Sequence, residues 1–361
     1  MKFLKIVLFI LVFVFAFNLS ACSSKLANNS SADNSEEDKT ASGDYVGTIA
    51  GEKINVPEFK FYLGISKNDM LTQAGVNAED KNAVKAFWES KSDNGTNADA
   101  VKNKSLDLIK ELKILLIKAK EDKVQLDNND LKNVKSFIDS AIQEEGGGDK
   151  AKAEDKIKET LGINLSQYES IYKDYLLAYT KYGNASVDKV EISDKEIRDY
   201  YDKNLQNYDK VTVKHILLLT QDNTTGQALT ADKVAEKKKL AEDILNKAKS
   251  GTDFDSLVTQ YSEDPGSKDS GGEYTFGKGE MVKEFEDWSF NAKEGDIGLV
   301  TSSYGFHIIK FIKKLDFDSQ KDTVKHDAQS DKFKQKLDEW KNDEKYKVQI
   351  NKKVFDSIKV Y

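Results

Sequence analysis

The hydrophobic pattern of this chain changes its period twice, and this change constrains the fold more than any other feature of the sequence. Residues 45–207 carry apolar side chains at helical spacing, as Leu106 and Ile109 do in one stripe. From Lys210 onward, short β-branched and apolar runs alternate with glycine-rich turns, and the helical pattern returns after residue 315. This order predicts a helical domain, an inserted domain that contains a sheet, and a helical tail.

The middle segment, residues 208–314, predicts a small antiparallel sheet flanked by helices. The expected elements are a strand at 210–219, helices at 231–249 and 254–261, a loop at 262–280 and a closing strand at 305–314. A length of about one hundred residues is usual for a domain.

Both flanks of this segment are predicted to be helical. Ser193 and Glu196 have the spacing of a capping box, which starts a helix before the segment. After the segment, residues 315–361 contain a helical pattern at 330–346 and a strand-like end at 354–361. The apolar face of this helix needs a partner, so we expect the tail to return to the N-terminal domain. The predicted fold class is α+β, with a mostly helical N-terminal domain that the C-terminal helix completes.

The first residues have the pattern of an export signal. Lys2 and Lys5 precede twelve apolar residues at 6–17. A membrane-spanning helix needs roughly 20 apolar residues, so this run is short for a permanent span. We therefore interpret residues 1–21 as a signal peptide.

The only cysteine of the chain follows this signal. Leu19, Ser20 and Ala21 before Cys22 are typical of a bacterial lipobox, in which the cysteine sulfur receives a diacylglyceryl group. The alternative is an ordinary signal peptide followed by a chance cysteine. Residues 22–44 are small and polar, and we interpret them as a lipidated, flexible tether to the membrane.

The composition excludes several classes of function. Arg198 is the only arginine and the formal net charge is −7, which argues against a nucleic-acid ligand. With Cys22 lipidated, no thiol remains for a disulfide. The sequence has no Cys or His cluster at metal spacing and no phosphate-binding glycine loop, so we expect no metal and no cofactor.

A series of motifs in residues 210–314 resembles the parvulin family. In chain order they are His215-Ile216-Leu217, Phe254 to Leu257, Ser262-Glu263-Asp264, Gly271-Gly272, Phe276 to Met281 with Phe285-Glu286, and Gly305-Phe306-His307-Ile308-Ile309. Each motif alone is weak, but six in the family's order are specific. The resemblance implies a peptidyl-prolyl cis-trans isomerase.

The resemblance also implies roles for individual residues. His215 and His307 would lie side by side on neighbouring strands, with Ser302 in the same hydrogen-bond network. Asp264 would face the substrate carbonyl, where other parvulins have cysteine, and would act through electrostatics or hydrogen bonding rather than as a nucleophile. The apolar wall for the proline ring would consist of four side chains, those of Met281, Phe285, Phe276 and Phe306.

The sequence also departs from the parvulin pattern. Where the family reads G-G-D-L-G-x-F, this chain has Gly271 to Phe276 in a shorter form, with Glu273, Tyr274 and Thr275 between. Residues 219–223 lack the basic side chains of phosphate-directed parvulins, so we expect no requirement for phosphoserine.

Outside this segment, residues 46–54 with Glu58-Phe59 resemble the start of the helical chaperone domain in PrsA-type foldase lipoproteins. The resemblance implies a lipid-anchored protein at the outer face of the cell membrane, whose partners are unfolded secreted polypeptides with X-Pro bonds. It leaves open whether the protein forms a homodimer.

Two alternatives to this function remain. The first is a holding chaperone whose parvulin domain binds but does not catalyse. The second is a solute-binding lipoprotein, which would need two lobes built from repeated βα units, whereas this chain has one short β-rich segment.

Overall fold

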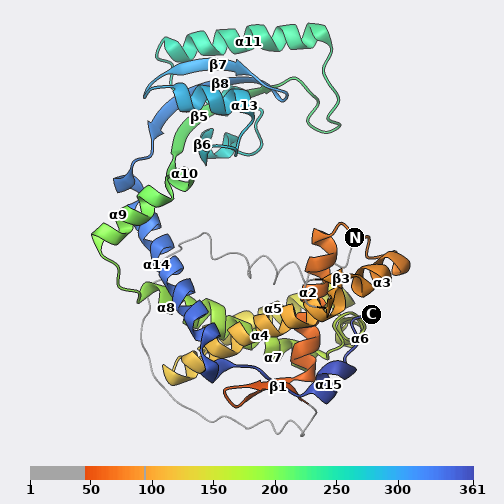
Figure 1. The fold of residues 1–361 in the computed structure, drawn as a ribbon. Coiled ribbons are helices and arrows are strands. Elements are labelled where there is room, and N and C mark those ends of the chain that lie inside the picture. The colour runs from red at the N-terminus through yellow and green to blue at the C-terminus, as the bar shows by residue number, and fades with distance from the viewer. Residues whose placement is uncertain (1–44, 93–94) are drawn as a thin grey trace. The chain divides into compact units, whose positions relative to one another are not determined.

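The computed structural model describes residues 45–92 and 95–361, which fall into two compact units (Figure 1). Unit 1 holds the described residues up to Glu191 together with Gln329–Tyr361, and unit 2 is Ile192–Ala328. The predicted signal peptide, Cys22 and the tether lie outside the described residues. Within the described residues, no helix combines the length and the apolar character that a membrane span requires.

Unit 1 is mostly helical. Its elements are β1 (Tyr45–Ile49), β2 (Glu52–Asn55), α2 (Val56–Gln73), α3 (Lys81–Glu89), β3 (Lys91–Ser92), β4 (Gly95–Thr96), α4 (Asn97–Glu121), α5 (Asn128–Gly146), α6 (Lys150–Leu161), α7 (Leu165–Tyr175), the π-helical η1 (Leu176–Gly183), α8 (Asn184–Asp188), the end of α14 (Phe317–Asn342), η3 (Glu344–Tyr346), β9 (Gln349–Ile350) and α15 (Lys352–Ser357).

The C-terminal segment completes the core of unit 1. Phe333 and Leu337 of α14 are buried in the same apolar cluster as Ile109 and Leu112 of α4. β9 also pairs with β1 in the three-stranded sheet β2-β1-β9, where Gly47 lies opposite Ile350. The fold class predicted from the sequence is therefore confirmed.

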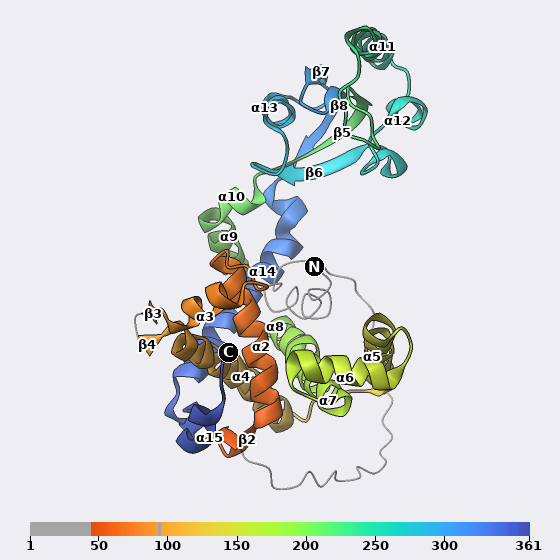
Figure 2. The same ribbon diagram turned by 90° about the vertical axis from the view of Figure 1, so that its right-hand side faces the viewer.

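Unit 2 contains the four-stranded antiparallel sheet β6-β5-β8-β7 (Figure 2). Its elements are α9 (Asp194–Lys203), α10 (Leu205–Tyr208), β5 (Lys210–Leu219), α11 (Ala231–Lys249), α12 (Phe254–Tyr261), η2 (Lys268–Ser270), β6 (Glu273–Gly277), α13 (Lys283–Asn291), β7 (Ile297–Thr301), β8 (Gly305–Lys314) and the start of α14. The predicted strands β5 and β8, the predicted helices α11 and α12 and the capping box at Ser193 are confirmed.

Each face of this sheet has its own apolar core, because successive residues of a strand point to opposite faces. On one face, Ile216 and Ile308 pack against α11 and α12. On the other, Val213 and Ile309 pack against residues of α13. β5 is consequently buried along nearly its whole length.

Two predictions about local structure are wrong. Residues 262–280 were expected to form a loop, but Glu273–Gly277 forms the edge strand β6. In this strand Tyr274 and Phe276 point to the core, whereas the residues before it are mostly Gly, Ser and Asp and have the pattern of a loop. Residues 354–361 were expected to be strand-like, but Lys352–Ser357 is helical, and the strand lies earlier, at Gln349–Ile350.

The limits of the two units differ from the predicted domain limits of 208 and 314. α9, α10 and the first half of α14 share a small core of Ile197, Tyr201, Tyr208 and Val324, which belongs to unit 2. The assignment of separate functions to the two parts of the chain stays a prediction.

Two glycines of unit 1 should respond to alanine in opposite directions. At Gly47 a Cβ would lie 2.7 Å from the backbone oxygen of Gln349, so Gly47→Ala should lower the free energy of unfolding by about 1–3 kcal/mol. At Gly64, inside α2, the nearest atom would be a Leu161 methyl at 3.8 Å, so Gly64→Ala should raise the free energy of unfolding by up to about 1 kcal/mol.

Fluorescence-detected unfolding in a Trp288→Phe background measures both changes. It reports on unit 1 alone, because the other tryptophans, Trp88 and Trp340, belong to that unit. Equal stabilities of the two variants would contradict the packing described.

Candidate active site

The centre of unit 2 holds a pair of buried histidines on adjacent strands. In the register of β5 with β8, His215 lies opposite Ile309 and His307 lies opposite Leu217, so both imidazoles point to the same face. Their Nδ1 atoms are 3.4 Å apart and their rings are nearly parallel, at 16°. The structure therefore brings together the two histidines singled out from the sequence.

The hydrogen bonds of this pair run in one direction. Ser302 Oγ lies 2.7 Å from Nε2 of His307, and Nε2 of His215 lies 3.0 Å from Oδ2 of Asp264. An ionised Asp264 can only accept, so His215 donates from Nε2 and accepts at Nδ1 from His307, whose Nε2 then accepts from Ser302. Every ring nitrogen is satisfied when both imidazoles are neutral.

The electrostatics agree with a neutral His307. Burial, followed by the proximity of His215, lowers the pKa of His307 to about 4. At neutral pH His307 therefore carries no charge, which the one-way pattern of hydrogen bonds requires.

Asp264 lies just beyond the C-terminus of α12, in a loop held against β5. Glu263 fixes this loop, since its backbone N–H donates to Leu217 O at 2.8 Å and its Oε2 accepts from Leu219 N at 2.8 Å. The Oδ2 atom of Asp264 accepts hydrogen bonds from His215, from Ser267 Oγ and from the Tyr274 hydroxyl, the last at 3.0 Å. The hydrogen bonds from His215, Ser267 and the N–H of Gly266 lower the pKa of Asp264 well below its usual range, against the effect of burial.

Sequence reasoning missed Ser267 and Tyr274. A signal for Tyr274 was available, because it stands two residues before Phe276 and alternate residues of a strand share a face. The Gly, Ser and Asp residues before it predict a loop instead, and this prediction hides the alternation. Ser267 had no comparable signal, because its contact depends on the turn at Pro265 and Gly266.

An apolar cluster borders the histidines. The ring of Phe285 on α13 stands edge-on to both imidazoles, with centroids 5.2 Å from His215 and 5.4 Å from His307. Phe276 on β6 is 5.6 Å from Phe285, and Met281 packs on the same cluster while remaining half-buried. Three of the four side chains expected in the apolar wall therefore lie together.

Phe306, the fourth, does not lie with them. It neighbours His307 in β8, and its side chain consequently points to the opposite face of the sheet, where it packs with Ile216 and Ile308. The expectation that Phe306 lines the proline pocket is wrong.

The double glycine lets β6 approach this centre closely. Gly272 has φ of +73°, and its carbonyl accepts the N–H of His215 at 2.8 Å. A Cβ at Gly272 would lie 2.4 Å from the His215 oxygen. A larger residue here would push β6, and with it Tyr274 and Phe276, away from the histidines.

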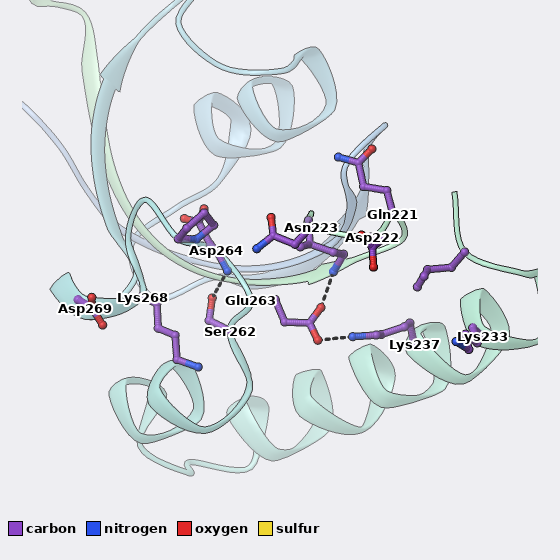
Figure 3. A pocket seen from close by; sticks show the side chains of 13 residues that line it. Gln221, Asp222, Asn223, Lys233, Lys237, Ser262, Glu263, Asp264, Lys268 and Asp269 are labelled. Carbon is purple, nitrogen blue, oxygen red and sulfur yellow. Dashed lines mark hydrogen bonds and ion pairs between the residues drawn. The ribbon is translucent and has the colours of Figure 1, made fainter. Parts of the chain in front are cut away.

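A charged hollow of about 750 Å³ opens beside Asp264 (Figure 3). It is lined by Asp222, Lys233, Lys237, Glu263, Lys268 and Asp269, besides Asp264 itself and several uncharged residues. The lysines come from α11 and the segment after Pro265, outside the stretch 219–223 that lacked basic residues. Lys237 pairs with Glu263, and the four carboxylates outnumber the three ammonium groups.

In the described part of the chain, no three His, Cys, Asp or Glu side chains are grouped as a metal site would need. The groups that the structure gathers at this centre are a carboxylate, two imidazoles, hydroxyls and an apolar surface.

Comparisons with known proteins agree with this geometry. A family model described as the PPIC-type PPIASE domain matches residues 200–315. The foldase protein PrsA of Caldanaerobacter subterraneus subsp. tengcongensis is 30% identical over 361 residues, which are 99% of this chain and 98% of the relative. The foldase protein PrsA of Geobacillus sp. is 35% identical over 155 residues, or 41% of this chain and 49% of the relative.

Among solved structures, the foldase protein PrsA from Streptococcus pneumoniae matches 84% of this chain and 88% of its own, with 19% identity and a TM-score of 0.36. PrsA from Bacillus subtilis matches 70% of this chain and 89% of its own, with 22% identity and a TM-score of 0.32. TM-scores this low support no conclusion about function.

The buried environment of His307 predicts a direct observable. Its imidazole should titrate near pH 4, because the interior disfavours the charged form. Since the unfolded chain takes up this proton near pH 6.5, His307 should also destabilise the fold progressively as the pH falls from about 6.5 to about 4. The chain has three histidines, so imidazole ¹⁵N spectra resolve each one, and His307→Asn assigns the signal. A midpoint near 6.5 would show that the ring is solvated.

Proposed function

We propose that this chain, which belongs to the PrsA foldase family and holds a parvulin-type peptidyl-prolyl cis-trans isomerase, assists secreted polypeptides at the outer face of the cell membrane. Its reaction is the rotation of X-Pro bonds, which otherwise takes tens of seconds or longer. The observation that carries the assignment of the site is the Asp264 carboxylate, fixed by His215 next to the apolar cluster of Phe276 and Phe285.

The apolar cluster offers a seat for the proline ring. Phe276 and Phe285 are buried and Met281 is half-buried, so Met281 can contact a ligand at the edge of the cluster. A proline ring bound here loses its contact with water. The amide C–N bond that precedes the proline then lies beside Asp264 while the residue before the proline rotates. Binding energy from the ring thus orients the amide for catalysis.

Asp264 is assigned an electrostatic role. In the planar amide, resonance places negative charge on the carbonyl oxygen and gives the C–N bond double-bond character. Twisting removes that resonance and with it part of the charge on the oxygen. A carboxylate held close to this oxygen therefore destabilises the planar amide more than the twisted one, which lowers the barrier of about 18–20 kcal/mol. The lowered pKa keeps the carboxylate ionised at neutral pH.

His215, His307 and Ser302 are assigned the role of holding that carboxylate. Their hydrogen bonds run from Ser302 through both rings to Asp264, so neither imidazole has a free ring nitrogen with which to exchange protons with a substrate. This agrees with a reaction in which no bond to hydrogen is made or broken. It also agrees with a site that works without a nucleophile.

The charged hollow is assigned to the residues that flank the proline. Its carboxylates outnumber its ammonium groups, and Lys237 is already paired with Glu263. A phosphate would meet net negative charge there, so we expect unphosphorylated X-Pro peptides to be substrates.

The place of action is assigned from the sequence. The run at 6–17 and the residues before Cys22 have the pattern of an exported lipoprotein, and residues 22–44 are polar enough for a tether. A lipid on Cys22 would hold the foldase where exported chains emerge. Formation of a homodimer stays an open prediction.

The helical unit is assigned to weak binding of unfolded clients. If the isomerase site bound proline without catalysis, the protein would be a holding chaperone with the same fold. An activity measurement separates the two.

The first test is the isomerisation rate of a short, unphosphorylated X-Pro peptide with residues 23–361. The parent should accelerate the reaction, and Asp264→Ala should lose about 100-fold in catalytic efficiency because the field on the amide is lost. His215→Ala should lose about tenfold or more in catalytic efficiency, since Asp264 loses a hydrogen-bond donor.

The matched controls are Asp243→Ala and His326→Ala, at exposed positions of α11 and α14, and both should be as active as the parent. A parent that suppresses aggregation of an unfolded client but does not isomerise the peptide supports the holding chaperone instead.

The anchor is tested by labelling cells with radioactive palmitate. The full chain should carry the label, and Cys22→Ala should abolish it because the chain has no other thiol. Ser23→Ala should leave it unchanged. Label retained by Cys22→Ala, or absent from the parent, would contradict lipidation at this residue.

A further inference from the structure

Tyr274 occupies a place between the two halves of the candidate active site. It lies on β6 opposite Val213 of β5, with its ring centroid 5.3 Å from that of His215. The ring packs on the same apolar cluster as Phe276 and Phe285, while the hydroxyl reaches Oδ2 of Asp264 at 3.0 Å. One side chain thus touches both the apolar surface and the carboxylate.

The hydrogen bonds of Asp264 are distributed unequally between its two oxygens. Oδ2 accepts from three side chains, those of His215, Ser267 and Tyr274. Oδ1 accepts only the backbone N–H of Gly266, at 3.2 Å. A carboxylate oxygen offers about two lone-pair sites, so Oδ2 is saturated, while Oδ1 keeps negative charge that can act on a ligand.

The hydroxyl of Tyr274 is a donor at neutral pH. Burial and the negative charge of Asp264 both raise the pKa of Tyr274. The phenol therefore stays protonated and donates its hydrogen bond to the Asp264 carboxylate. In the sequence, Glu273-Tyr274 stands where the parvulin pattern reads Asp-Leu, so this chain introduces a hydroxyl at the rim of the site.

We propose that Tyr274 is a positioning residue of the isomerase site, whose hydroxyl locks the Asp264 carboxylate so that Oδ1 faces the substrate carbonyl and whose ring forms part of the proline pocket. The inference rests on the proposed role of Asp264. Three donors contact Oδ2, and Tyr274 supplies the one whose ring also packs on the apolar cluster. The segment Gly272 to Phe276, although shorter than in the parvulin pattern, therefore still forms the rim of the pocket, with Tyr274 as its contact to Asp264.

Gly266 provides an independent way to disturb the same contact. A Cβ at Gly266 would lie 2.4 Å from the Tyr274 hydroxyl oxygen and 3.6 Å from Oδ1 of Asp264. The backbone there is not in the left-handed region, so alanine is tolerated and the flexible end of Tyr274 must move instead. Gly266→Ala should therefore displace the hydroxyl without removing it.

The experiment measures peptide isomerisation at limiting and saturating peptide for residues 23–361 carrying Tyr274→Phe, Gly266→Ala, or both. Tyr274→Phe keeps the ring, so kcat should fall about tenfold while KM changes less than about twofold. Gly266→Ala should cause a similar loss. The double variant should be no worse than either single variant, because both remove the same hydrogen bond. Tyr261→Phe removes a hydroxyl that contacts Lys247 on α11 and is the matched control.

The outcomes separate this inference from the function on which it rests. An active parent that is sensitive to Asp264→Ala, together with an unchanged kcat in Tyr274→Phe, overturns the role of Tyr274 alone. Losses that multiply in the double variant also overturn it, since the two changes would then act independently. A parent without activity, or one insensitive to Asp264→Ala, overturns the assignment of Asp264 and this inference together.

Discussion

The antiparallel pairing of β5 with β8 is the constraint on which the site depends. It places His307 opposite Leu217, two residues along β5 from His215, so both imidazoles lie on one face of the sheet and their Nδ1 atoms are in contact. A register shift of one residue would turn one imidazole into the opposite core. The same alternation sends Phe306 to that opposite core, where it packs with α11 and α12. Two apolar cores on opposite faces of the sheet, one of them beside the two histidines, therefore follow from one pair of strands.

The polar groups of the centre form one system with Asp264 at its end. Each of three groups donates to the next, from Ser302 to His307, from His307 to His215 and from His215 to Asp264. The carboxylate also accepts hydrogen bonds from Ser267 and Tyr274. Burial makes an unpaired charge costly, and the same burial makes these hydrogen bonds strong. The result is a fixed negative charge next to an apolar surface. Rotation of a prolyl amide changes its charge distribution without transferring a proton, and we propose that this environment promotes that rotation.

The sequence predicted the parts of this arrangement that repeat over several residues. β5 and β8 have long apolar runs, and α11 and α12 have clear helical periods, so their limits agree with the structure. β6 was missed because five residues with two inward side chains, Tyr274 and Phe276, give little signal after a stretch of Gly, Ser and Asp. The residues His215, Asp264 and His307 could be singled out only through the family's motifs. Ser267 could not, since its role depends on a turn that periodicity does not detect. Tyr274 alternates with Phe276, but the Gly, Ser and Asp residues before them favour a loop and outweigh this signal.

The ¹⁵N chemical shifts of the imidazoles at neutral pH report the direction of the hydrogen bonds between the two histidines. We expect His215 to carry its proton on Nε2 and His307 on Nδ1, with both rings neutral. Asp264→Ala should then release His215 from its single tautomer. A cationic His215, or a proton on Nε2 of His307, would contradict the account, because Ser302 and Asp264 would then no longer be the two ends of one chain of hydrogen bonds.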